Sequence, residues 1–412
     1  MLILHTADLH LGVERYGRID PQTGLSSRLG DFLAVFDQAV ECALAQKVDL
    51  FLFCGDAYKS HDPTQTQQRE FARRVNRLAA AGIPVFLVAG NHDLPRAPAR
   101  ASAVEIFDTL AVEGVIVAHT PRSYLLQTAF GPLQLVALPW AHRSALMTRE
   151  ESRGMGLEEV NRAIEERLSR WLEAQAQALD PSLPALLAAH GWVSGAKVGS
   201  EKGMVLGQDH VLLRSTLAQP GYDYIAMGHL HRRQTLGSTP PIVYAGSLER
   251  LDFGEEGEDK GFYLVDIDPS RKNGERLVSY TFHPVKARSF LTIEVQPRGE
   301  DPTPAVLEAI ARYPLEGAVV RLQLKLRSPQ DAQLREAEVR RALQGAYSFA
   351  INLEVEREQR TRLGSQARGI TPLEALRAYL DTRKPPLDPS WAQELLRYGE
   401  RLIAGAPAEE EP

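Results

Sequence analysis

Short apolar runs recur through the first two thirds of the chain, and helical patterns lie between the early ones. Several of these runs are apolar almost throughout, which is typical of strands covered on both faces. The nine runs are residues 2–7, 48–54, 84–90, 115–119, 133–138, 185–190, 224–229, 241–246 and 261–267. Apolar positions recur at helical spacing over residues 29–46 and 64–82, and the second stretch closes on Gly82, which suits a helix end. The alternation predicts a layered α/β domain over residues 1–285.

The pattern changes after residue 285. Five segments follow one another as strand, helix, strand, helix and strand, which is enough for a small separate domain over residues 286–356. The segments are residues 290–296, 304–313, 318–326, 331–343 and 349–356. The sequence therefore predicts two folded domains with different layouts.

The last part of the chain is predicted to comprise a linker, a helix pair and a tail. Residues 357–370 are polar and rich in arginine, as in a linker. Two short amphipathic helices are expected within residues 371–405, with Thr371 and Asp388 as their N-caps. Such a pair can hardly bury a core alone, so it either folds back on the main body or docks on a partner. Residues 406–412 are expected to be a disordered tail.

The bulk composition is that of a globular protein. Of 412 residues, 44% are hydrophobic and 24% are charged. The N-terminus lacks the pattern of a signal peptide, and no run approaches the roughly 18 apolar residues of a membrane span, so a cytoplasmic protein without membrane association is expected. The two cysteines, Cys42 and Cys54, argue against a disulfide framework or a thiolate metal site. The formal net charge of −6 argues against adhesion to nucleic acid over the whole surface, but leaves room for binding through a local patch or a bound metal.

Five of the apolar runs end in polar residues that could bind a metal ion or take part in catalysis. These residues are Asp8 and His10, then Asp56, then Asn91, His92 and Asp93, then His190, and finally His229 and His231. The carboxyl ends of strands are where the loops of a layered sheet converge and where such folds place their sites. In an extended segment residues i and i+2 face the same way, so each D-x-H or H-x-H pair would present two ligands to one face.

This set of side chains suits a pair of divalent cations. The candidate ligands are Asp8, His10, Asp56, Asn91, His190, His229 and His231. Imidazole and carboxylate ligands without thiolate favour manganese, iron or zinc over calcium. Two divalent cations would exceed the charge of two carboxylates by about +2, which suits an anionic phosphate and the activation of water for in-line attack on phosphorus. His92 is the candidate acid that protonates the leaving oxygen, and Asp93 is the candidate that orients it.

Five short motifs, taken together, resemble the signature of a known family. The motifs are DLH at 8–10, GDAY at 55–58, GNHD at 90–93, HGW at 190–192 and GHLH at 228–231. In this order they are similar to those of the calcineurin-like metallophosphoesterases. The later run YAGSLERLDFGEEGEDKGFYLVDID, at residues 244–268, resembles the segment that marks one branch, the SbcD exonucleases, bacterial counterparts of the meiotic recombination nuclease.

The resemblance covers nearly the whole chain and implies an architecture. It implies a layered mixed β-sandwich flanked by helices for residues 1–285 and a small α+β capping domain for residues 286–356. The helix pair at 371–405 resembles an element that docks on the coiled coil of an SMC-like ATPase, SbcC. Members of the branch also pair as homodimers, through helices that here resemble residues 64–80 and 99–112.

Carried over position by position, the resemblance implies two metal sites that share one carboxylate. One site takes Asp8, His10, Asp56 and His231, and the other takes Asp56, Asn91, His190 and His229. The counterpart of His92 assists catalysis without binding metal. The expected cofactors are two Mn²⁺ ions or other divalent metals.

The function implied by the resemblance is that of a manganese-dependent DNA nuclease. Members cut duplex DNA as 3'-5' exonucleases and cleave single strands and hairpins as endonucleases. They act with the ATPase in DNA end processing, recombination and double-strand break repair. Two other functions stay open: a phosphatase or phosphodiesterase of the same superfamily that acts on small molecules, and a non-catalytic DNA-end scaffold. The residues that follow the catalytic domain favour a polymeric substrate and a partner.

One position departs from the family pattern. Several relatives carry a histidine three residues after the bridging aspartate, where this chain has Lys59, and His61 is the alternative substitute. Lysine pairs with phosphate as a point charge but does not exchange protons with it as imidazole does. The candidate DNA contacts are Lys59, Arg15, Arg96 and Arg232, with Arg18, Arg28, Arg100 and Arg233 as further candidates. Recognition of DNA shape and backbone is expected, since no recognition helix or base-stacking motif is evident.

Overall fold

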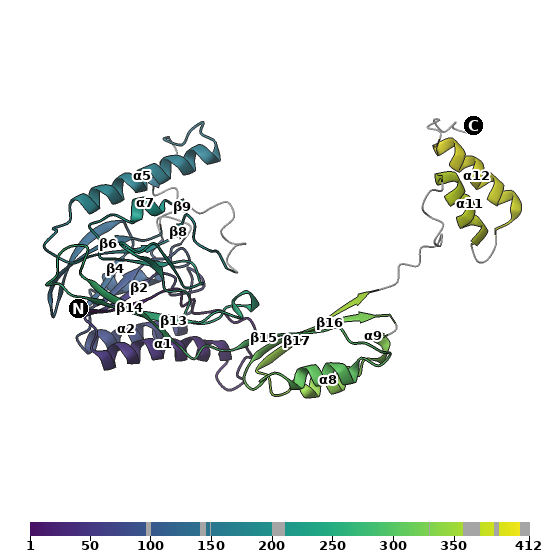
Figure 1. Cartoon of the computed structure of the whole chain (residues 1–412), viewed down its shortest axis with the longest axis horizontal. Coiled ribbons are helices and arrows are strands. Elements are labelled where there is room, and N and C mark those ends of the chain that lie inside the picture. Colours follow the sequence, from purple (N-terminus) through teal and green to yellow (C-terminus); the bar gives the residue numbers. More distant parts are fainter. Residues whose placement is uncertain are drawn as a thin grey trace.

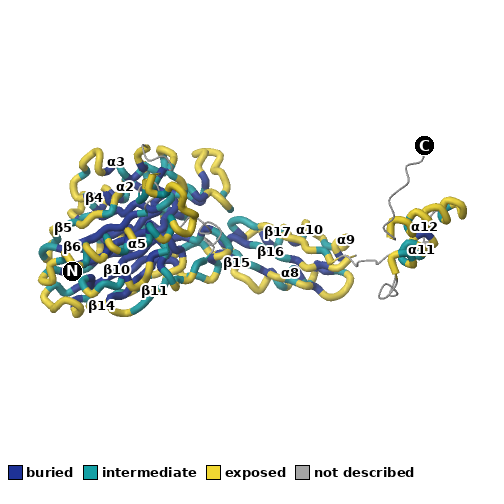
Figure 2. Tube along the Cα trace, turned by 90° about the horizontal axis from the view of Figure 1, so that it is seen from above, coloured by how far each residue is buried: buried dark blue, intermediate teal, exposed yellow. Residues whose placement is uncertain are grey.

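The computed structural model describes residues 1–95, 100–140, 146–148, 150–199, 211–328, 330–356, 371–382 and 387–403. These residues form a large unit, a small three-stranded unit and a separate pair of helices (Figure 1). The large unit is built on two six-stranded mixed sheets. The small unit extends from one end of it, beginning with strand β15 (Phe290–Val295) (Figures 1 and 2).

The first sheet of the large unit has the order β14–β13–β1–β2–β3–β4. Its strands are β1 (Leu2–Thr6), β2 (Leu50–Cys54), β3 (Val85–Val88), β4 (Val115–Ala118), β13 (Gly261–Ile267) and β14 (Leu277–Pro284). Strands β1 to β4 are parallel, and β13 and β14 continue the sheet in antiparallel pairing. The carboxyl ends of β1, β2 and β3 therefore lie at one edge.

The second sheet has the order β11–β12–β10–β7–β6–β5. Its strands are β5 (Arg122–Thr128), β6 (Gly131–Leu138), β7 (Ala185–His190), β10 (Tyr224–Gly228), β11 (Gln234–Leu236) and β12 (Ile242–Tyr244). The four inner strands are parallel, and β5 and β11 are antiparallel edges. A short parallel pair, β8 (Trp192–Val193) and β9 (Val211–Leu212), stands beside this sheet.

The core is layered because the strands bury both faces. Leu50 and Leu52 of β2 pack between the two sheets with Leu186 of β7, whereas Phe51 and Phe53 face the opposite way, toward the helices. All five residues of β2 are buried, as the continuous apolar run predicted. In Figure 2 the buried segments, drawn dark blue, lie at the centre of the large unit. The predicted layered mixed β-sandwich flanked by helices is confirmed.

Helices cover the outer faces of both sheets. The helical segments of the large unit are α1 (Ser27–Gln46), α2 (Gln65–Ala80), η1 (Ala103–Glu105), α3 (Ile106–Thr109), α5 (Leu157–Gln177), α7 (Arg214–Leu217) and η2 (Phe253–Glu255). α1 and α2 pack on the first sheet, and α5 packs on the second. Thr64 and Gln67 form a capping box that fixes the start of α2. Among the described helices, none is long and apolar enough to cross a membrane.

The small unit has its own core and an all-parallel sheet. Its elements are β15 (Phe290–Val295), α8 (Thr303–Ala311), β16 (Val319–Arg327), α9 (Gln330–Gln333), α10 (Glu336–Ala342) and β17 (Ser348–Glu356). The sheet order is β15–β16–β17, so β15 is an edge strand. Ile293, Leu322 and Val339 are among the residues of its apolar core. The predicted strand and helix succession is confirmed, except that the single helix expected over residues 331–343 is two short helices, α9 and α10.

The C-terminal helices are also where the sequence predicted them. They are α11 (Pro372–Thr382) and α12 (Pro389–Ile403), and they pack against each other, set apart from the other two units (Figure 1). Thr371 accepts a hydrogen bond from the amide of Glu374, and Asp388 accepts one from the amide of Ser390, so both predicted N-caps are confirmed. The predicted linker at 357–370 and tail at 406–412 lie outside the described residues.

Glycine at one strand end permits the two sheets to approach closely. A Cβ atom built on Gly228, at the end of β10, would lie 1.9 Å from the carbonyl oxygen of Cys54 at the end of β2. We expect Gly228→Ala to destabilise the protein by about 1–3 kcal/mol or more, because backbone has to move to relieve the overlap. Thermal unfolding measures the loss. The control is Gly30→Ala in α1, where the new Cβ meets open space and should stabilise the helix by up to about 1 kcal/mol. Equal melting temperatures for the two variants would contradict the close approach.

Candidate metal centre

The candidate ligands gather where loops from both sheets meet. Asp8 and His10 follow β1, Asp56 follows β2 and Asn91 follows β3, all from the first sheet. From the second sheet, His190 ends β7, and His229 and His231 follow β10. The first two loops continue the strand pairing, since the amide of Asp8 donates to the Gly55 carbonyl at 2.9 Å and that of His10 donates to the Asp56 carbonyl at 3.0 Å.

The backbone at these loops is left-handed rather than extended. The φ angles are +52° at Asp8, +51° at His10, +58° at Asp56 and +99° at His229. Among the described residues, these account for four of the seven non-glycine positions with positive φ. The sequence predicted that Asp8 and His10 lie on an extended segment. This was wrong, because both residues have positive φ angles. Such conformations cost about 1–3 kcal/mol each and cluster at functional sites, where they aim side chains that a regular strand would point elsewhere.

Asp56 lies between two groups of ligand atoms. Its Oδ2 is 3.7 Å from Nε2 of His10 and 3.5 Å from Nε2 of His190, while its Oδ1 accepts a hydrogen bond from the amide of His92 at 2.8 Å. One group comprises Asp56, His10 and His92, and the other comprises Asp56, His190 and His229, with all ligand atoms of a group within 4.8 Å of one another. A carboxylate shared by two groups is the arrangement expected of a bridging ligand.

Hydrogen bonds on the outer side of the imidazoles turn their lone pairs inward. Nδ1 of His190 lies 2.7 Å from the Cys54 carbonyl and must donate to it, because a carbonyl only accepts. Its Nε2 faces Asn91 Oδ1 at 3.0 Å, a contact that only a proton or a metal ion on Nε2 makes favourable. Nε2 of His231 lies 2.9 Å from Nε2 of His10, a member of the first group. Imidazole nitrogens, an amide oxygen and a shared carboxylate that converge in this way bind cations, so these residues fit a pair of metal ions.

The electrostatics of the pocket also favour bound positive charge. Burial alone would lower the pKa of the His190 imidazole, but the carboxylates of Asp56 and Asp8 raise it to about 9. Burial alone would raise the pKa of Asp56, but its imidazole neighbours hold it well below the usual range. Without metal, protons supply the positive charge that the ligand set attracts.

Asp8 is placed differently from the other predicted ligands. Its carboxylate is fully buried, and both oxygens accept from the amide of His229 at 3.0 Å. Like His231, it lies outside the two groups of close ligand atoms. Burial, aided by Asp56, raises the pKa of Asp8 to about 6. Its role as a metal ligand stays a prediction.

The structure gives His92 and Asp93 separate roles. Nδ1 of His92 donates to the Lys59 carbonyl at 2.9 Å, and the ring lies edge-on to His10 with 4.9 Å between centroids. Asp93 instead accepts from the amides of Asp56 and Gly90, at 2.8 and 2.9 Å. The expectation that Asp93 orients His92 was therefore wrong: the Lys59 carbonyl orients the imidazole, and Asp93 holds the loop of the shared carboxylate.

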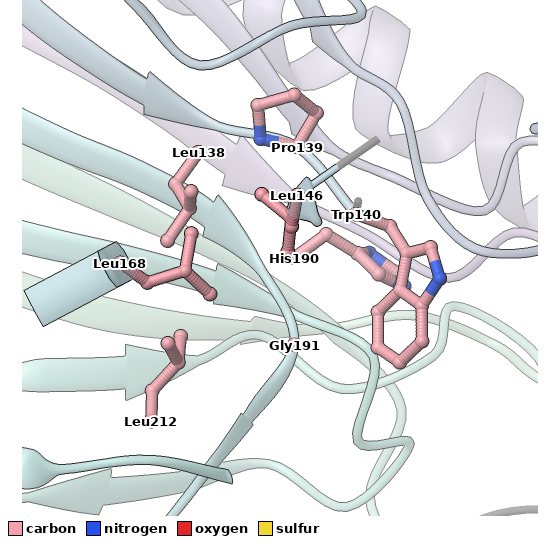
Figure 3. A pocket seen from close by; sticks show the side chains of 8 residues that line it. All are labelled: Leu138, Pro139, Trp140, Leu146, Leu168, His190, Gly191 and Leu212. Carbon is pink, nitrogen blue, oxygen red and sulfur yellow. The ribbon is translucent and has the colours of Figure 1, made fainter. Parts of the chain in front are cut away.

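Trp140 and an apolar pocket lie beside the second group of ligand atoms. Trp140 stacks on His229, with ring centroids 5.2 Å apart and planes at 30°, and meets His190 edge-on at 6.4 Å. Figure 3 shows Trp140 and His190 at one side of a pocket that Leu138, Leu168 and others line with apolar side chains. Trp140 thus contacts both imidazoles, and the apolar pocket borders His190.

The candidate DNA contacts lie mostly on the surface around the centre. Arg15 and Arg232 are exposed, and Lys59 is half-buried beside His92. Arg96 lies outside the described residues. Arg28, a further candidate, was a wrong prediction, because it is fully buried and donates to the Asp31 carboxylate and the Arg250 carbonyl.

Sequence reasoning missed three residues of this region. Trp140 is one, and Glu255 and Lys260 are the others: Glu255 accepts from Nδ1 of His231 at 2.8 Å and pairs with Lys260 at 2.8 Å. Glu255 and Lys260 belong to the run at residues 244–268 that carried the branch resemblance, so a signal existed, but spacing alone did not assign them a partner.

Comparison with known proteins places the chain in a family. The sequence profile of the calcineurin-like phosphoesterases matches residues 1–233, more than half of the chain. The chain belongs to this family. It is therefore a metal-dependent phosphoesterase, in agreement with the site geometry.

Similar proteins narrow the position within the family. The chain is 27% identical over 348 residues to the SbcD subunit of the SbcCD nuclease of Rhodobacter capsulatus, covering 80% of this chain and 81% of that protein. It is 26% identical over 276 residues to the DNA double-strand break repair protein Mre11 of Thermoplasma acidophilum, covering 66% of this chain and 62% of that protein. A dimetal phosphatase of Danio rerio is a distant structural neighbour, with 15% identity, a TM-score of 0.38, and coverage of 64% of this chain and 92% of that one. This phosphoesterase is thus similar to SbcD and Mre11 nucleases.

Proposed function

We propose that this phosphoesterase is the nuclease subunit of an SbcCD-type complex that processes DNA ends. The observation that carries the proposal is the pair of ligand groups that share Asp56, on a chain similar to an SbcD nuclease over 80% of its length. The substrate is duplex DNA, cut by a 3'-5' exonuclease activity, together with single strands and hairpins, cut endonucleolytically. The biological setting is double-strand break repair in the cytoplasm of a bacterial cell.

Two Mn²⁺ ions are the proposed cofactors. Asp8, His10, Asp56 and His231 would hold one ion, and Asp56, Asn91, His190 and His229 would hold the other. When bound, the ions supply a polarised phosphoryl oxygen and an activated water. The mixture of imidazole, carboxylate and amide ligands is suited to manganese, since magnesium prefers oxygen ligands alone.

The chain's own residues orient the reaction. The shared carboxylate of Asp56 keeps the two groups at a fixed separation, and Asp93 fixes the loop that carries it by accepting from the amides of Asp56 and Tyr58. His92, held at Nδ1 by the Lys59 carbonyl, keeps Nε2 for exchange of a proton with the leaving oxygen of the cleaved strand. The Lys59 ammonium, together with Arg15 and Arg232, would contact phosphates as point charges.

The direct test offers two substrates to the same preparation. Purified protein with Mn²⁺ is incubated with end-labelled duplex DNA and, separately, with a chromogenic phosphodiester. We expect shortening of the duplex from its 3' ends, and loss of activity when a chelator removes the metal. Turnover of the small ester with no attack on DNA would instead favour a small-molecule phosphodiesterase of the same superfamily.

A homodimer through α2 and α3 is part of the proposal. Phe71 of α2 and Phe107 of α3 are in contact, with ring centroids 6.2 Å apart, so the two helices form one continuous surface. Ile106 and Leu110 project from this surface and are 46% and 67% exposed. The expected range 99–112 begins at residue 99, which lies outside the described residues.

Exposed large side chains on α12 support docking of the helix pair on a partner ATPase. Within α12, four large side chains recur on one face and are 38–64% exposed: Trp391, Leu395, Tyr398 and Leu402. Their spacing makes a continuous stripe, the pattern with which an amphipathic helix enters a groove or pairs with a coiled coil. We propose that this stripe binds the coiled coil of the ATPase subunit.

Removing the helix pair should separate partner binding from catalysis. Deletion of residues 365–412 is expected to abolish co-purification with the ATPase subunit while leaving the manganese-dependent nuclease activity of the free protein unchanged. Trp391→Ser alone should cost about 2 kcal/mol or more of binding free energy, because buried tryptophans anchor interfaces. Glu394→Ala, next to the stripe, serves as the matched control. An undiminished complex after the deletion would refute docking through these helices.

A further inference from the structure

The short turn η2 carries a buried carboxylate that reaches a candidate metal ligand. Oε1 of Glu255 accepts from Nδ1 of His231 at 2.8 Å, and its other oxygen pairs with the Lys260 ammonium at 2.8 Å. Both side chains of the ion pair are fully buried. The Lys260 ammonium also donates to the backbone carbonyl of His231 at 3.1 Å. The ion pair therefore holds His231 at two points, its ring and its main chain.

This contact determines which nitrogen of His231 faces the centre. Because a carboxylate accepts the proton of Nδ1, the lone pair of the ring lies on Nε2, the atom that faces Nε2 of His10 at 2.9 Å. The amide of Leu251 also donates to Glu255 at 3.3 Å, so with His231 and Lys260 the carboxylate itself is held in one orientation. The same ring without Glu255 could take either tautomer.

Phe253 and Glu256, before and after Glu255 in the chain, contact the small unit. Glu256 accepts from the amide and the hydroxyl of Thr292 in β15, at 2.7 and 2.5 Å. Phe253 contacts the ring of Phe290, also in β15, with centroids 5.0 Å apart, and lies under the Arg321 guanidinium of β16. Since β15 is an edge strand, Glu256 satisfies an amide that no neighbouring described strand pairs.

We propose that Glu255 is a positioning residue for His231 and that the η2 turn couples the metal centre to the small unit. The inference rests on the proposed function, because it takes His231 to be a metal ligand. Movement of β15 displaces Glu256 and Phe253, and with them the carboxylate that fixes the His231 ring. Conversely, a metal ion that fixes His231 stabilises the contact between Glu256 and Thr292, as the reciprocity of coupled sites requires.

The first test compares two variants of the ion pair. Glu255→Gln/Lys260→Met removes both charges together, so neither is left buried and unpaired. Glu258→Gln is the control, since Glu258 also pairs with Lys260, at 2.9 Å, while Glu255 bonds the His231 ring. We expect the double variant to bind Mn²⁺ about 10- to 100-fold more weakly at one of its two sites, the usual effect of losing the partner of a metal-binding histidine. Unchanged affinity in the double variant would overturn the positioning role.

An NMR measurement on metal-free protein tests this inference independently of the proposed function. Nitrogen-15 NMR of histidine-labelled metal-free protein reports the tautomer of His231, assigned by its absence in His231→Gln. We expect the proton on Nδ1 in the unsubstituted protein and in Glu258→Gln, and a mixture of tautomers in Glu255→Gln/Lys260→Met. The same tautomer in all three proteins would overturn the inference. Failure of the unsubstituted protein to bind Mn²⁺ would instead overturn the proposed function.

Hydrogen exchange tests the coupling. Addition of Mn²⁺ should slow amide exchange in the peptide that contains β15, because His231, Glu255, Glu256 and Thr292 form one connected path. Glu256→Ala breaks this path at the surface of the small unit and should abolish the slowing, whereas Glu258→Ala should preserve it. Equal slowing in both variants would show that the turn does not carry the coupling.

Discussion

Asp56→Asn is expected to abolish binding of both metal ions and to reduce hydrolysis to that of the metal-free protein. The carboxylate is common to both ligand groups, with Oδ2 at 3.7 Å from His10 and 3.5 Å from His190. A carboxamide keeps the shape and can still accept from the amide of His92, but it lacks the charge that two cations share. We expect affinity to fall more than the roughly 10- to 100-fold that loss of an outer partner causes.

Thermal unfolding with and without Mn²⁺ provides the measurement. Metal that binds only the folded protein raises its melting temperature, so the unsubstituted protein should show a metal-dependent shift and Asp56→Asn should show none. Asp223→Asn is the matched control, because Asp223 is another buried carboxyl that accepts from the amide of Ala185, at the opposite end of β7 from His190. The control should lose stability and keep the shift. A full shift in Asp56→Asn would exclude a bridging role.

Much of the fold could be predicted because burial on both faces leaves a continuous signal. The five residues of β2 are all buried and all apolar, so length and flanking glycine were enough to identify a strand. β14 gave no such signal, since most of its residues are half-buried or exposed and its sequence LVSYTFHP mixes polar and apolar positions. Helix α5 could have been found, because Ile164, Leu168 and Leu172 recur at helical spacing. What remained hidden was the pairing of strands distant in sequence, such as β1 with β13.

The candidate site, like the fold, has one part that the sequence predicts and one part that it does not. The rule that parallel strands bring their carboxyl ends together was sufficient to gather Asp56 and Asn91, which follow neighbouring strands of the first sheet, but not His190, which ends a strand of the second sheet. It could not predict which acceptor each imidazole takes on its outer side, because these acceptors are backbone carbonyls or carboxylates from remote segments. The Lys59 carbonyl on His92 and the Glu255 carboxylate on His231 are of this kind. Sequence spacing thus indicates ligands well and their hydrogen-bonded partners poorly.

His92→Ala is expected to keep both metal ions and to lose about 10²- to 10⁴-fold in the rate of phosphodiester cleavage, the usual contribution of an acid or base group. The ring lies within ligand distance of His10 and Asp56, so proximity alone does not assign its role. Its Nδ1 is committed to the Lys59 carbonyl, and seven other side chains are available for two ions. A proton donor to the leaving oxygen is therefore the role that the geometry favours.

Metal content and leaving-group dependence together distinguish the two roles of His92. If His92 protonates the leaving oxygen, the variant should retain two Mn²⁺ ions per chain and lose least rate on an ester whose leaving group needs no proton. His283→Ala is the matched control, because His283 lies on β14, the edge strand of the first sheet, stacks on Phe262 and should leave both rate and metal content unchanged. Loss of one ion together with activity would make His92 a ligand. The equal loss of rate for good and poor leaving groups would likewise contradict proton donation, since an acid helps most where the departing oxygen is most basic.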